Sequence, residues 1–364
     1  MTRILILGNA ILGLYSFRYE LLEKLLEKDY EVHFSVPEDK NNEKVIELIN
    51  LGCKHIKTIV DSRGMNPLND LKLTKQYKKI VKKVNPDIIL SYTIKPNIYG
   101  AYVAKKYKIP IIINITGLGS SFNNKKTKFM VKNMYKYASK RASFIFFQNQ
   151  ENYNYFINNK LAKKEKSKII PGSGVNLEKF IPQKKSKDDN IIRFLFIGRI
   201  MKEKGIEEYL EAAKNIKNKY PNVEFQILGH YEEEQYKQIL ENSTYVNYLG
   251  KSEDVRKEIK EVDCIINPSY HEGMSNVLLE GAAMEKFLIA SDIPGCREIV
   301  ENNYNGYTFE VKNSKDLEDK IERFIKLPKE EKQKMSKNSR KKVEKEFDRN
   351  IIIDEYLKKI KELI

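Results

Sequence analysis

Two glutamates eight positions apart lie in the stretch of sequence best suited to chemistry, Asn267 to Ala283. An apolar run before it predicts a buried strand, and the apolar spacing after Ser275 predicts a helix that Ser275 caps. Glu272 then stands in a Gly-bearing loop and Glu280 on the helix. The first N–H groups of a helix bind anions, and carboxylates accept hydrogen bonds from hydroxyl groups. The pattern suits a ligand with phosphates and hydroxyls, although such a pair also occurs as a helix-dipole carboxylate and a solvated one.

A second element, further back in the chain, favours the ligand interpretation. The apolar run ending at Ile197 predicts a strand that leads into Gly198 and Arg199, and Lys204 precedes the next helical pattern. Arginine offers a planar fork and lysine a point charge, so two cations at a strand-to-helix turn suit a diphosphate. We therefore expect a diphosphate-bearing ligand at this turn.

Length and composition define the class of protein. A chain of 364 residues with 41% hydrophobic residues is long enough for two domains with large cores. Its three cysteines, Cys53, Cys264 and Cys296, are widely spaced in or beside apolar segments, which predicts buried, reduced thiols rather than a disulfide framework or a zinc site. The apolar start, Met1 to Leu7, is too short for a targeting segment and reads as a first strand. No run approaches the roughly 20 apolar residues of a membrane span.

The positive charge is concentrated in the first half of the chain. Residues 1–190 carry 35 Lys and Arg against 17 Asp and Glu, whereas residues 191–364 carry 31 against 33. A general lysine bias would raise lysine in both halves and would not remove acids from one. The basic half therefore implies an anionic partner, either a membrane surface or a nucleic acid.

Strands alternate with helices throughout, which predicts an α/β fold of two doubly wound parallel-sheet, Rossmann-like domains facing a central cleft. We expect the first domain at 1–180, a linker at 181–190, the second domain at 191–348, and a C-terminal helix at 349–364 that returns to the first domain. The loops at 8–13 and 117–122 would face the cleft from the first domain.

The predicted helix at 125–141 carries much of the positive charge together with several large apolar residues. An amphipathic, basic and aromatic helix can lie on a membrane surface. A solvated outer face above an ordinary core stripe fits the same pattern, so the sequence leaves both interpretations open.

These motifs together resemble glycosyltransferase family 4, retaining enzymes of the GT-B fold. The resemblance rests on Gly198-Arg199, Lys204-Gly205, the E-x7-E spacing of Glu272 and Glu280, and the downstream Asp292-Ile293-Pro294-Gly295. It implies that Arg199 and Lys204 hold the donor diphosphate, that Glu272 contacts the donor sugar, and that Glu280 binds the ribose hydroxyls. Arg199, Lys204 and Glu272 would be the catalytic residues. The other donor-binding residues it implies are Gly13, Gly198, Gly273, Met274, Ser275, Asn276 and Val277.

Other segments resemble bacterial family members that extend polyprenyl-diphosphate-linked glycans, such as the N-acetylgalactosaminyltransferases of bacterial N-glycosylation. They are Tyr92 to Asn97, Thr116 to Gly119 and Ser173 to Asn176. The resemblance implies acceptor binding by Lys95, Thr116, Gly117 and Gly119. Many members carry a histidine in the loop after the fifth strand, but this chain has none there, and His33, His55, His230 and His271 cannot be assigned to that role.

The resemblance implies a reaction that needs no protein base, because the leaving UDP phosphate takes the acceptor proton while cations stabilise the diphosphate. No D-x-D element lies at a strand end, so we expect neither a metal nor another cofactor. The expected partners are a UDP-sugar, a lipid-linked acceptor and an anionic membrane surface, with no nucleic acid. The expected location is cytoplasmic, peripheral on the inner face of the membrane. The alternatives are a GT-B sugar-nucleotide epimerase, which needs catalytic acids and a histidine from the first domain, and a basic nucleic-acid-binding protein.

Overall fold

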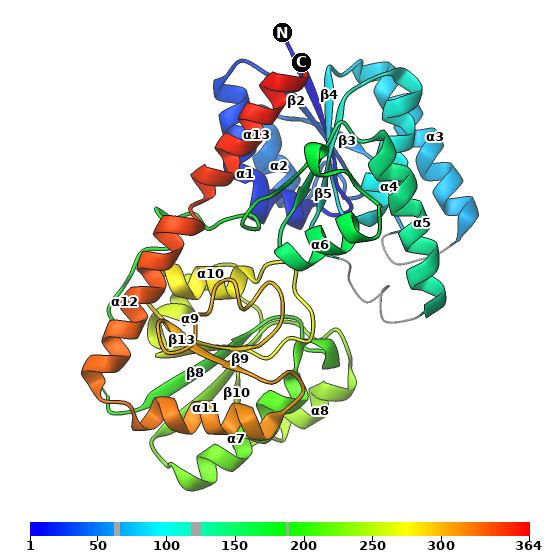
Figure 1. The fold of residues 1–364 in the computed structure, drawn as a ribbon. Helices are drawn as coiled ribbons and strands as arrows, with labels where there is room; N and C mark the ends of the chain where they lie inside the picture. The colour runs from blue at the N-terminus through cyan, green and yellow to red at the C-terminus, as the bar shows by residue number, and fades with distance from the viewer. Residues whose placement is uncertain (62–65, 118–124, 187–188) are drawn as a thin grey trace. The chain divides into compact units, whose positions relative to one another are not determined.

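The computed structural model describes residues 1–61, 66–117, 125–186 and 189–364, with the backbone alone at 125–127. It divides into two units, the first formed by residues 1–173 and 350–364 and the second by residues 174–349. Each unit is built on one parallel sheet with helices on both faces (Figure 1). The predicted α/β class with two doubly wound domains is confirmed. The division falls between Ser173 and Gly174, and residues 181–190 lie within the second unit.

The first sheet has the strand order β3-β2-β1-β4-β5-β6-β7 among the described residues. Every pairing is parallel, and β1 lies between β2 and β4, with Ile4 opposite both Val32 and Ile88. Ligands of such sheets bind outside the carboxyl ends of the strands where the order changes direction. The strands are β1 (Arg3–Leu7), β2 (Glu31–Val36), β3 (Lys54–Lys57), β4 (Ile88–Tyr92), β5 (Ile111–Ile115), β6 (Phe144–Phe147) and β7 (Ser167–Ile169).

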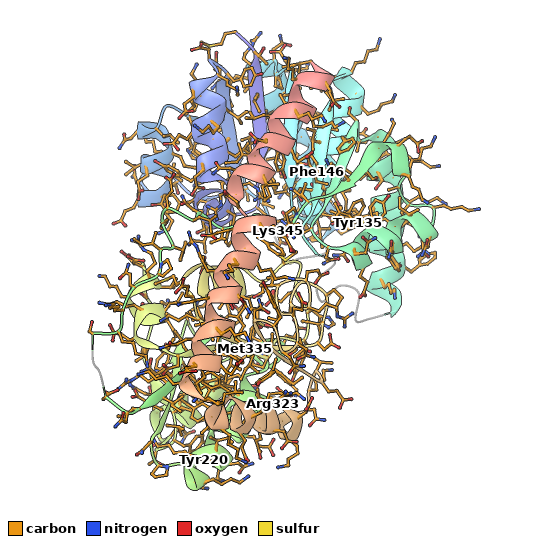
Figure 2. All side chains as sticks on the ribbon, turned by 60° about the vertical axis from the view of Figure 1, so that its left-hand side comes forward. Tyr135, Phe146, Tyr220, Arg323, Met335 and Lys345 are labelled. Atoms are coloured by element: carbon orange, nitrogen blue, oxygen red, sulfur yellow. The ribbon has the colours of Figure 1, made fainter. Side chains whose placement is uncertain are left out.

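Helices cover both faces of this sheet and bury two separate hydrophobic clusters. One cluster joins the sheet to α1 (Ile11–Glu27), α2 (Glu43–Asn50) and α13 (Arg349–Leu363). The other joins it to α3 (Pro67–Val84), α4 (Ile94–Tyr107), α5 (Lys125–Arg141) and α6 (Gln150–Asn158). Figure 2 labels a fully buried ring from each cluster, Phe146 and Tyr135. The single turn η2 (Lys164–Lys166) precedes β7.

The C-terminal helix α13 is part of the core of the first unit. Ile352, Ile353 and Ile360 belong to the cluster beneath α1. The Tyr356 ring packs 4.8 Å from that of Phe146, measured between centroids. The last residues of the chain therefore complete the hydrophobic core that the first residues begin.

One helix start differs from the sequence prediction. Helix α1 begins at Ile11, within the segment 8–13 that the sequence predicts as a loop, and the Ile11 amide donates to Glu38 Oε2 at 2.9 Å. Because this capping carboxylate comes from the loop after β2, local sequence gave no sign of it. Helix α4 begins at Ile94. In the second unit, Gly306 opens the strand β13 (Gly306–Phe309), which pairs with β12 (Phe287–Ser291).

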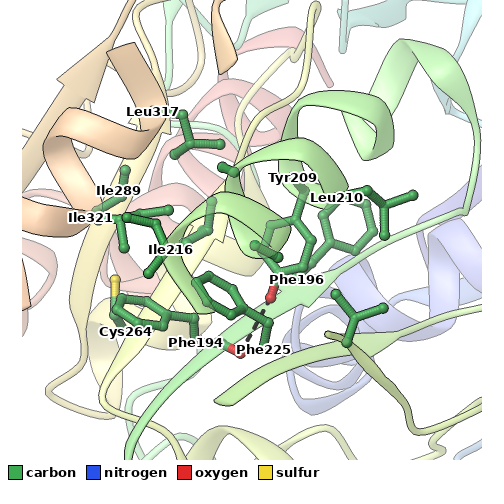
Figure 3. Packing of buried hydrophobic residues seen from close by; sticks show 14 of the residues in the cluster. Phe194, Phe196, Tyr209, Leu210, Ile216, Phe225, Cys264, Ile289, Leu317 and Ile321 are labelled. Carbon is green, nitrogen blue, oxygen red and sulfur yellow. Dashed lines mark hydrogen bonds between the residues drawn. The ribbon is translucent and has the colours of Figure 1, made fainter. Parts of the chain in front are cut away.

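The second sheet has the order β10-β9-β8-β11-β12-β13 among the described residues. Phe194 and Phe225 stack at 4.8 Å on neighbouring strands, and the Tyr209 hydroxyl donates to the Phe194 carbonyl oxygen at 3.3 Å (Figure 3). Its remaining strands are β8 (Ile192–Ile197), β9 (Val223–Leu228), β10 (Asn247–Tyr248) and β11 (Cys264–Asn267). Its helices are η3 (Lys202–Lys204), α7 (Ile206–Lys219), α8 (Gln235–Glu241), α9 (Arg256–Glu261), α10 (Asn276–Ala283), α11 (Ser314–Lys326) and α12 (Lys329–Glu346).

The three cysteines are buried and free, as the sequence predicts. Burial raises the pKa of all three thiols, that of Cys53 to about 12. None of the helices in the described part of the chain is both long and apolar enough to cross a membrane.

Candidate functional site

The turn after β8 presents Arg199 at the carboxyl end of the second sheet. Gly198 follows the strand, and Gly229 follows the neighbouring strand β9 with φ of +153°. A Cβ on Gly229 would lie 1.7 Å from the Gly198 carbonyl oxygen, so only glycine allows the two turns to approach this closely. The approach brings Glu232 within 3.6 Å of Arg199 Nη1 and 3.8 Å of His230 Nε2.

Arg199 is the more accessible of the two predicted catalytic cations. Its side chain is 42% exposed, whereas that of its carboxylate partner Glu232 is 19% exposed. A long, solvent-screened ion pair of this kind is weak, so the guanidinium is free to exchange its partner for a phosphate.

Lys204 lies in a tighter setting. Lys204 is the last residue of the turn η3, and the next residue, Gly205, has φ of +73°. A Cβ on Gly205 would lie 2.0 Å from the Pro268 carbonyl oxygen, so the two backbones are in close contact. The amide of Tyr270 donates to the Glu203 carbonyl oxygen at 3.0 Å. The η3 turn and the loop after β11 are therefore held together through their backbones.

This backbone contact brings two predicted site residues into an ion pair. Lys204 Nζ lies 2.7 Å from Glu272 Oε1, and both side chains are mostly buried, with 22% and 16% exposed. Ser269 also donates to Glu272 Oε1, at 2.8 Å. Lys204 and Glu272 are 68 residues apart in the chain. The distance between them along the sequence does not predict this ion pair, which forms only in the folded chain.

The helix α10 begins where the sequence predicts. Ser275 is its N-cap and accepts from the Leu278 amide at 3.4 Å, while Asn267 donates to the Ser275 hydroxyl at 2.6 Å. The first bond within the helix runs from the Leu279 amide to the Ser275 carbonyl oxygen. The amides of Asn276 and Val277 precede that bond and point out of the helix end, where they suit an anionic ligand.

The loop before α10 is fixed by the predicted Asp292 to Gly295 element. The Ser275 amide donates to the Gly295 carbonyl oxygen at 2.9 Å, and Gly295 lies against Gly273 and Glu272. Met274 is buried beneath the loop, and the His271 side chain is exposed. The loop thus has a rigid base and an accessible tip.

Glu280 has the most perturbed carboxyl group of the site. Burial raises its pKa to about 7, and the positive charges of Arg349 and Lys179 oppose the shift only in part. Among the residues that the structure describes, its carboxylate has neither a hydrogen-bond donor nor an ion-pair partner. A desolvated carboxylate without a donor costs free energy, and hydroxyl groups of a ligand would offset that cost.

The site residues predicted in the first unit lie at or near the carboxyl edge of its sheet. Gly13 is within the first turn of α1, and the prediction of a loop there is wrong because α1 already begins at Ile11. Lys95 Nζ pairs with Asp70 at 2.8 Å, in a contact that joins α4 to α3. Thr116 and Gly117 follow β5, whereas Gly119 lies outside the described residues.

Sequence reasoning missed several partners of these residues. Glu38, Asp70, Glu232 and Ser269 each contact a predicted site residue or the amide at the start of α1. Glu38 and Ser269 each lie two residues after the end of a strand, and that position is the signal that could have identified them. Within the described ranges, no group of three or more His, Cys, Asp or Glu side chains is placed to hold a metal ion.

Comparison with known protein families gives two matches that together span most of the chain. Residues 178–342 match the model described as glycosyl transferases group 1, and residues 3–149 match the model described as glycosyl transferase 4-like.

Two named relatives cover most of the chain. One, from Campylobacter jejuni, is N,N'-diacetylbacillosaminyl-diphospho-undecaprenol alpha-1,3-N-acetylgalactosaminyltransferase, 33% identical and covering 98% of this chain and 97% of the relative. Another is an Escherichia coli UDP-Gal:alpha-D-GlcNAc-diphosphoundecaprenol alpha-1,3-galactosyltransferase, 27% identical and covering 82% and 85%.

Solved structures share the fold at low sequence identity. A glycosyltransferase from Rickettsia africae superposes with a TM-score of 0.80 at 22% identity, covering 100% of this chain and 98% of the other. The Anabaena protein HepE, in complex with UDP and glucose, superposes with a TM-score of 0.81 at 17% identity over the whole of both chains.

Proposed function

This chain belongs to the group 1, family 4-like glycosyltransferases, and from that premise we propose that it moves a hexose or N-acetylhexosamine from a UDP-sugar to a polyprenyl-diphosphate-linked glycan, with retention. The observation that carries the proposal is the near full-length similarity to a transferase named for a diphospho-undecaprenol-linked acceptor. The relatives described above are transferases, which gives the epimerase alternative no support. We also propose that the enzyme acts as a peripheral protein on the inner face of the cytoplasmic membrane.

In the proposed donor site, Arg199 and Lys204 bind the diphosphate, and the amides at the start of α10 bind a phosphate or the sugar. Glu280 accepts hydrogen bonds from the ribose hydroxyls, which its lack of a donor in the described structure supports. Lys204 then exchanges Glu272 for phosphate, and the freed Glu272 carboxylate turns to the hydroxyls of the sugar. Donor binding and the release of this ion pair would thus be one event.

The proposed chemistry follows from these roles. The bond between the sugar C1 and the UDP oxygen breaks, and the acceptor hydroxyl oxygen bonds to C1 on the same face. The acceptor proton passes to the departing phosphate oxygen, so UDP leaves and no protein base is needed. Arg199 and Lys204 stabilise the charge that develops on the leaving diphosphate, an effect worth about 10²–10³ in rate for one well-placed donor.

On the acceptor side, we propose that Lys95, Thr116, Gly117 and Gly119 contribute to binding, and that Gly13 approaches the donor diphosphate from the first unit. Lys95 and Asp70 are mostly buried, with 13% and 17% exposed. Lys95 therefore acts either by exchanging Asp70 for the acceptor or by holding α4 in place. Lys95→Met distinguishes these roles: the first predicts a higher KM for the acceptor, and the second predicts a lower stability.

The donor assignment can be tested by thermal unfolding of the purified protein with UDP, GDP, UDP-GlcNAc, UDP-GalNAc, UDP-Glc and UDP-Gal. A ligand at about 100 times its dissociation constant stabilises by roughly 2.7 kcal/mol. A UDP-sugar should raise the Tm of the wild type and of Lys219→Ala, a control that removes a surface ion pair with Glu322, but not that of Arg199→Ala or Glu280→Ala. A folded wild-type protein that none of the six ligands stabilises would contradict the proposal.

The reaction itself is tested with the best donor and a polyprenyl-diphosphate-linked acceptor. We expect the lipid product to carry the anomeric configuration of the donor, read by the one-bond C–H coupling at C1 in NMR. We propose that no metal ion is required, so activity should persist after dialysis against EDTA. Loss of activity that Mg²⁺ or Mn²⁺ restores would overturn this part of the proposal.

A further inference from the structure

A hollow in the first unit lies between α3, α4 and α5, three helices that stand side by side on one face of the sheet (Figure 1). Its volume is about 590 Å³, within the range of pockets that hold small ligands. The lining is mainly apolar and aromatic and includes Leu71, Ile98, Tyr102, Met134 and Tyr137. No residue that we assign to sugar transfer lines it.

Apolar side chains continue from the hollow onto the outer surface of these helices. On α5, Phe129 is 70% exposed and Met130 is 40% exposed. On α3, Leu68 and Leu71 are 65% and 59% exposed. Exposed apolar side chains beside an apolar hollow favour contact with another apolar phase, because water disfavours them. The apolar residues of α5 therefore fall into two groups. Val131 and Tyr135 are buried in the core, whereas Phe129 and Met130 form a separate exposed edge.

The charges around the hollow are almost all positive. Helices α3, α4 and α5 contain sixteen Lys or Arg residues and one acid, Asp70, and that acid pairs with Lys95. Lys78 Nζ lies 5.2 Å from the centre of the Tyr102 ring at the edge of the hollow. Lysine stems cover apolar surface while their charges reach outward, and tyrosines favour the boundary between hydrocarbon and water.

We infer that this surface, the outer face of α3, α4 and α5, docks on a bilayer of anionic phospholipid, and that one acyl chain enters the hollow. The lysines match the headgroup charge, and the hollow and its apolar rim match the hydrocarbon. A nucleic acid would satisfy the lysines but would leave Phe129, Leu68 and the hollow without an apolar partner. The inference rests on the proposed function for its purpose, which is to hold the transferase beside a membrane-embedded acceptor.

The attraction of the lysines to anionic lipid is tested by sedimentation of the 364-residue protein with two kinds of vesicle. One contains phosphatidylcholine alone, and the other contains phosphatidylcholine mixed with phosphatidylglycerol. We expect binding only with the anionic lipid. Each lysine near such a surface contributes roughly fivefold to partitioning. Lys75, Lys79 and Lys82 are exposed on one side of α3, so K75E/K79E/K82E should weaken binding by about 100-fold or more. The control K341E/K345E reverses two exposed lysines on α12 and should bind like the wild type.

The insertion of an acyl chain into the hollow is tested by tryptophan fluorescence, because the sequence contains no tryptophan of its own. Tyr137→Trp places one fluorophore at the hollow, and Tyr304→Trp places one at a similarly exposed position of the second unit. With vesicles brominated on the acyl chains, we expect quenching of the Tyr137→Trp emission and little change for Tyr304→Trp. Phe129→Ser should weaken vesicle binding, whereas Ile239→Ser, at an exposed isoleucine of α8, should not.

Three results would overturn the inference: equal sedimentation of wild type and K75E/K79E/K82E, no quenching of Tyr137→Trp in vesicle-bound protein, or tighter retention on duplex DNA than on anionic vesicles. Quenching by a brominated short polyprenyl phosphate but not by brominated phospholipid would assign the hollow to an isoprenoid instead. Vesicle binding is measured without donor or acceptor, and sugar transfer can be measured with a detergent-solubilised acceptor. Either measurement can therefore fail while the other succeeds. The two proposals are thereby separated.

Discussion

Lys204 Nζ lies 2.7 Å from Glu272 Oε1, so the cation of the first motif and the first carboxylate of the second form one ion pair. Both groups are proposed to contact the donor, one through phosphate and the other through the sugar. Because Lys204 and Glu272 pair with each other in this structure, donor binding at both groups would break their ion pair and form one contact to phosphate and one to the sugar. In the proposed function, the pair would therefore couple recognition of the diphosphate to recognition of the sugar.

Lys204→Met should abolish most activity with little loss of fold. We expect kcat/KM to fall by about 10²–10³, because the variant lacks a charge that is proposed to stabilise the leaving diphosphate. The free energy of unfolding should fall by only about 1–2 kcal/mol, because Ser269 still donates to the Glu272 carboxylate. Steady-state kinetics and urea unfolding measure the two effects. Lys219→Met, at another 2.7 Å ion pair, is the control and should retain wild-type kinetics.

Glu280→Gln should stabilise the protein at alkaline pH while it removes donor binding. The pKa of Glu280 is raised to about 7, so the folded state binds its proton more tightly than the unfolded chain does. Stability from this group is therefore present at low pH and is lost as pH rises from about 4.5 to 7. The amide has no charge to desolvate, so we expect a gain on the order of 3 kcal/mol at pH 8 and less than about 1 kcal/mol at pH 5.

Thermal unfolding at the two pH values, without added nucleotide, measures the effect of Glu280→Gln. A variant less stable than the wild type at pH 8 would contradict the burial that raises this pKa. The same variant should show no rise in Tm with the UDP-sugar that stabilises the wild type.

Gly229→Ala should destabilise the second unit severely. A methyl group there would meet the Gly198 carbonyl oxygen at 1.7 Å, and the φ of +153° is unfavourable for alanine. We expect a loss of about 3 kcal/mol or more, or failure to fold. Gly250→Ala is the matched control, since its φ is +79° but nothing lies within 4 Å. It should cost only about 1 kcal/mol. Similar losses for the two variants would disprove the close approach of the turns.

Gly13→Ala distinguishes the helix seen in the structure from the loop expected from sequence. Gly13 lies in α1 with nothing within 4 Å of the added methyl group. Alanine in a helix is favoured over glycine by about 0.5–1 kcal/mol, so Tm should rise by a few degrees. A fall in Tm would show that Gly13 needs a backbone conformation other than helix. If Tm rises while donor affinity falls, the approach of Gly13 to the donor is supported.

The sequence by itself determined the class of fold and the local elements that carry the candidate site of the second unit. Apolar runs and helical spacing predict two doubly wound sheets, because buried parallel strands and amphipathic helices impose those periods locally. The cap at Ser275 and the helix carrying Glu280 were predicted correctly, since capping depends on residues within one turn.

Only the tertiary structure decided which distant groups meet. Glu38 accepts from the Ile11 amide at the start of α1, Asp70 pairs with Lys95, and Lys204 pairs with Glu272, although the members of each pair are 25 to 68 residues apart. The raised pKa of Glu280 and the open apolar hollow beside α5 likewise arise from packing. Residue order records local preferences directly, whereas contacts and desolvation exist only after strands and helices have been brought together in three dimensions.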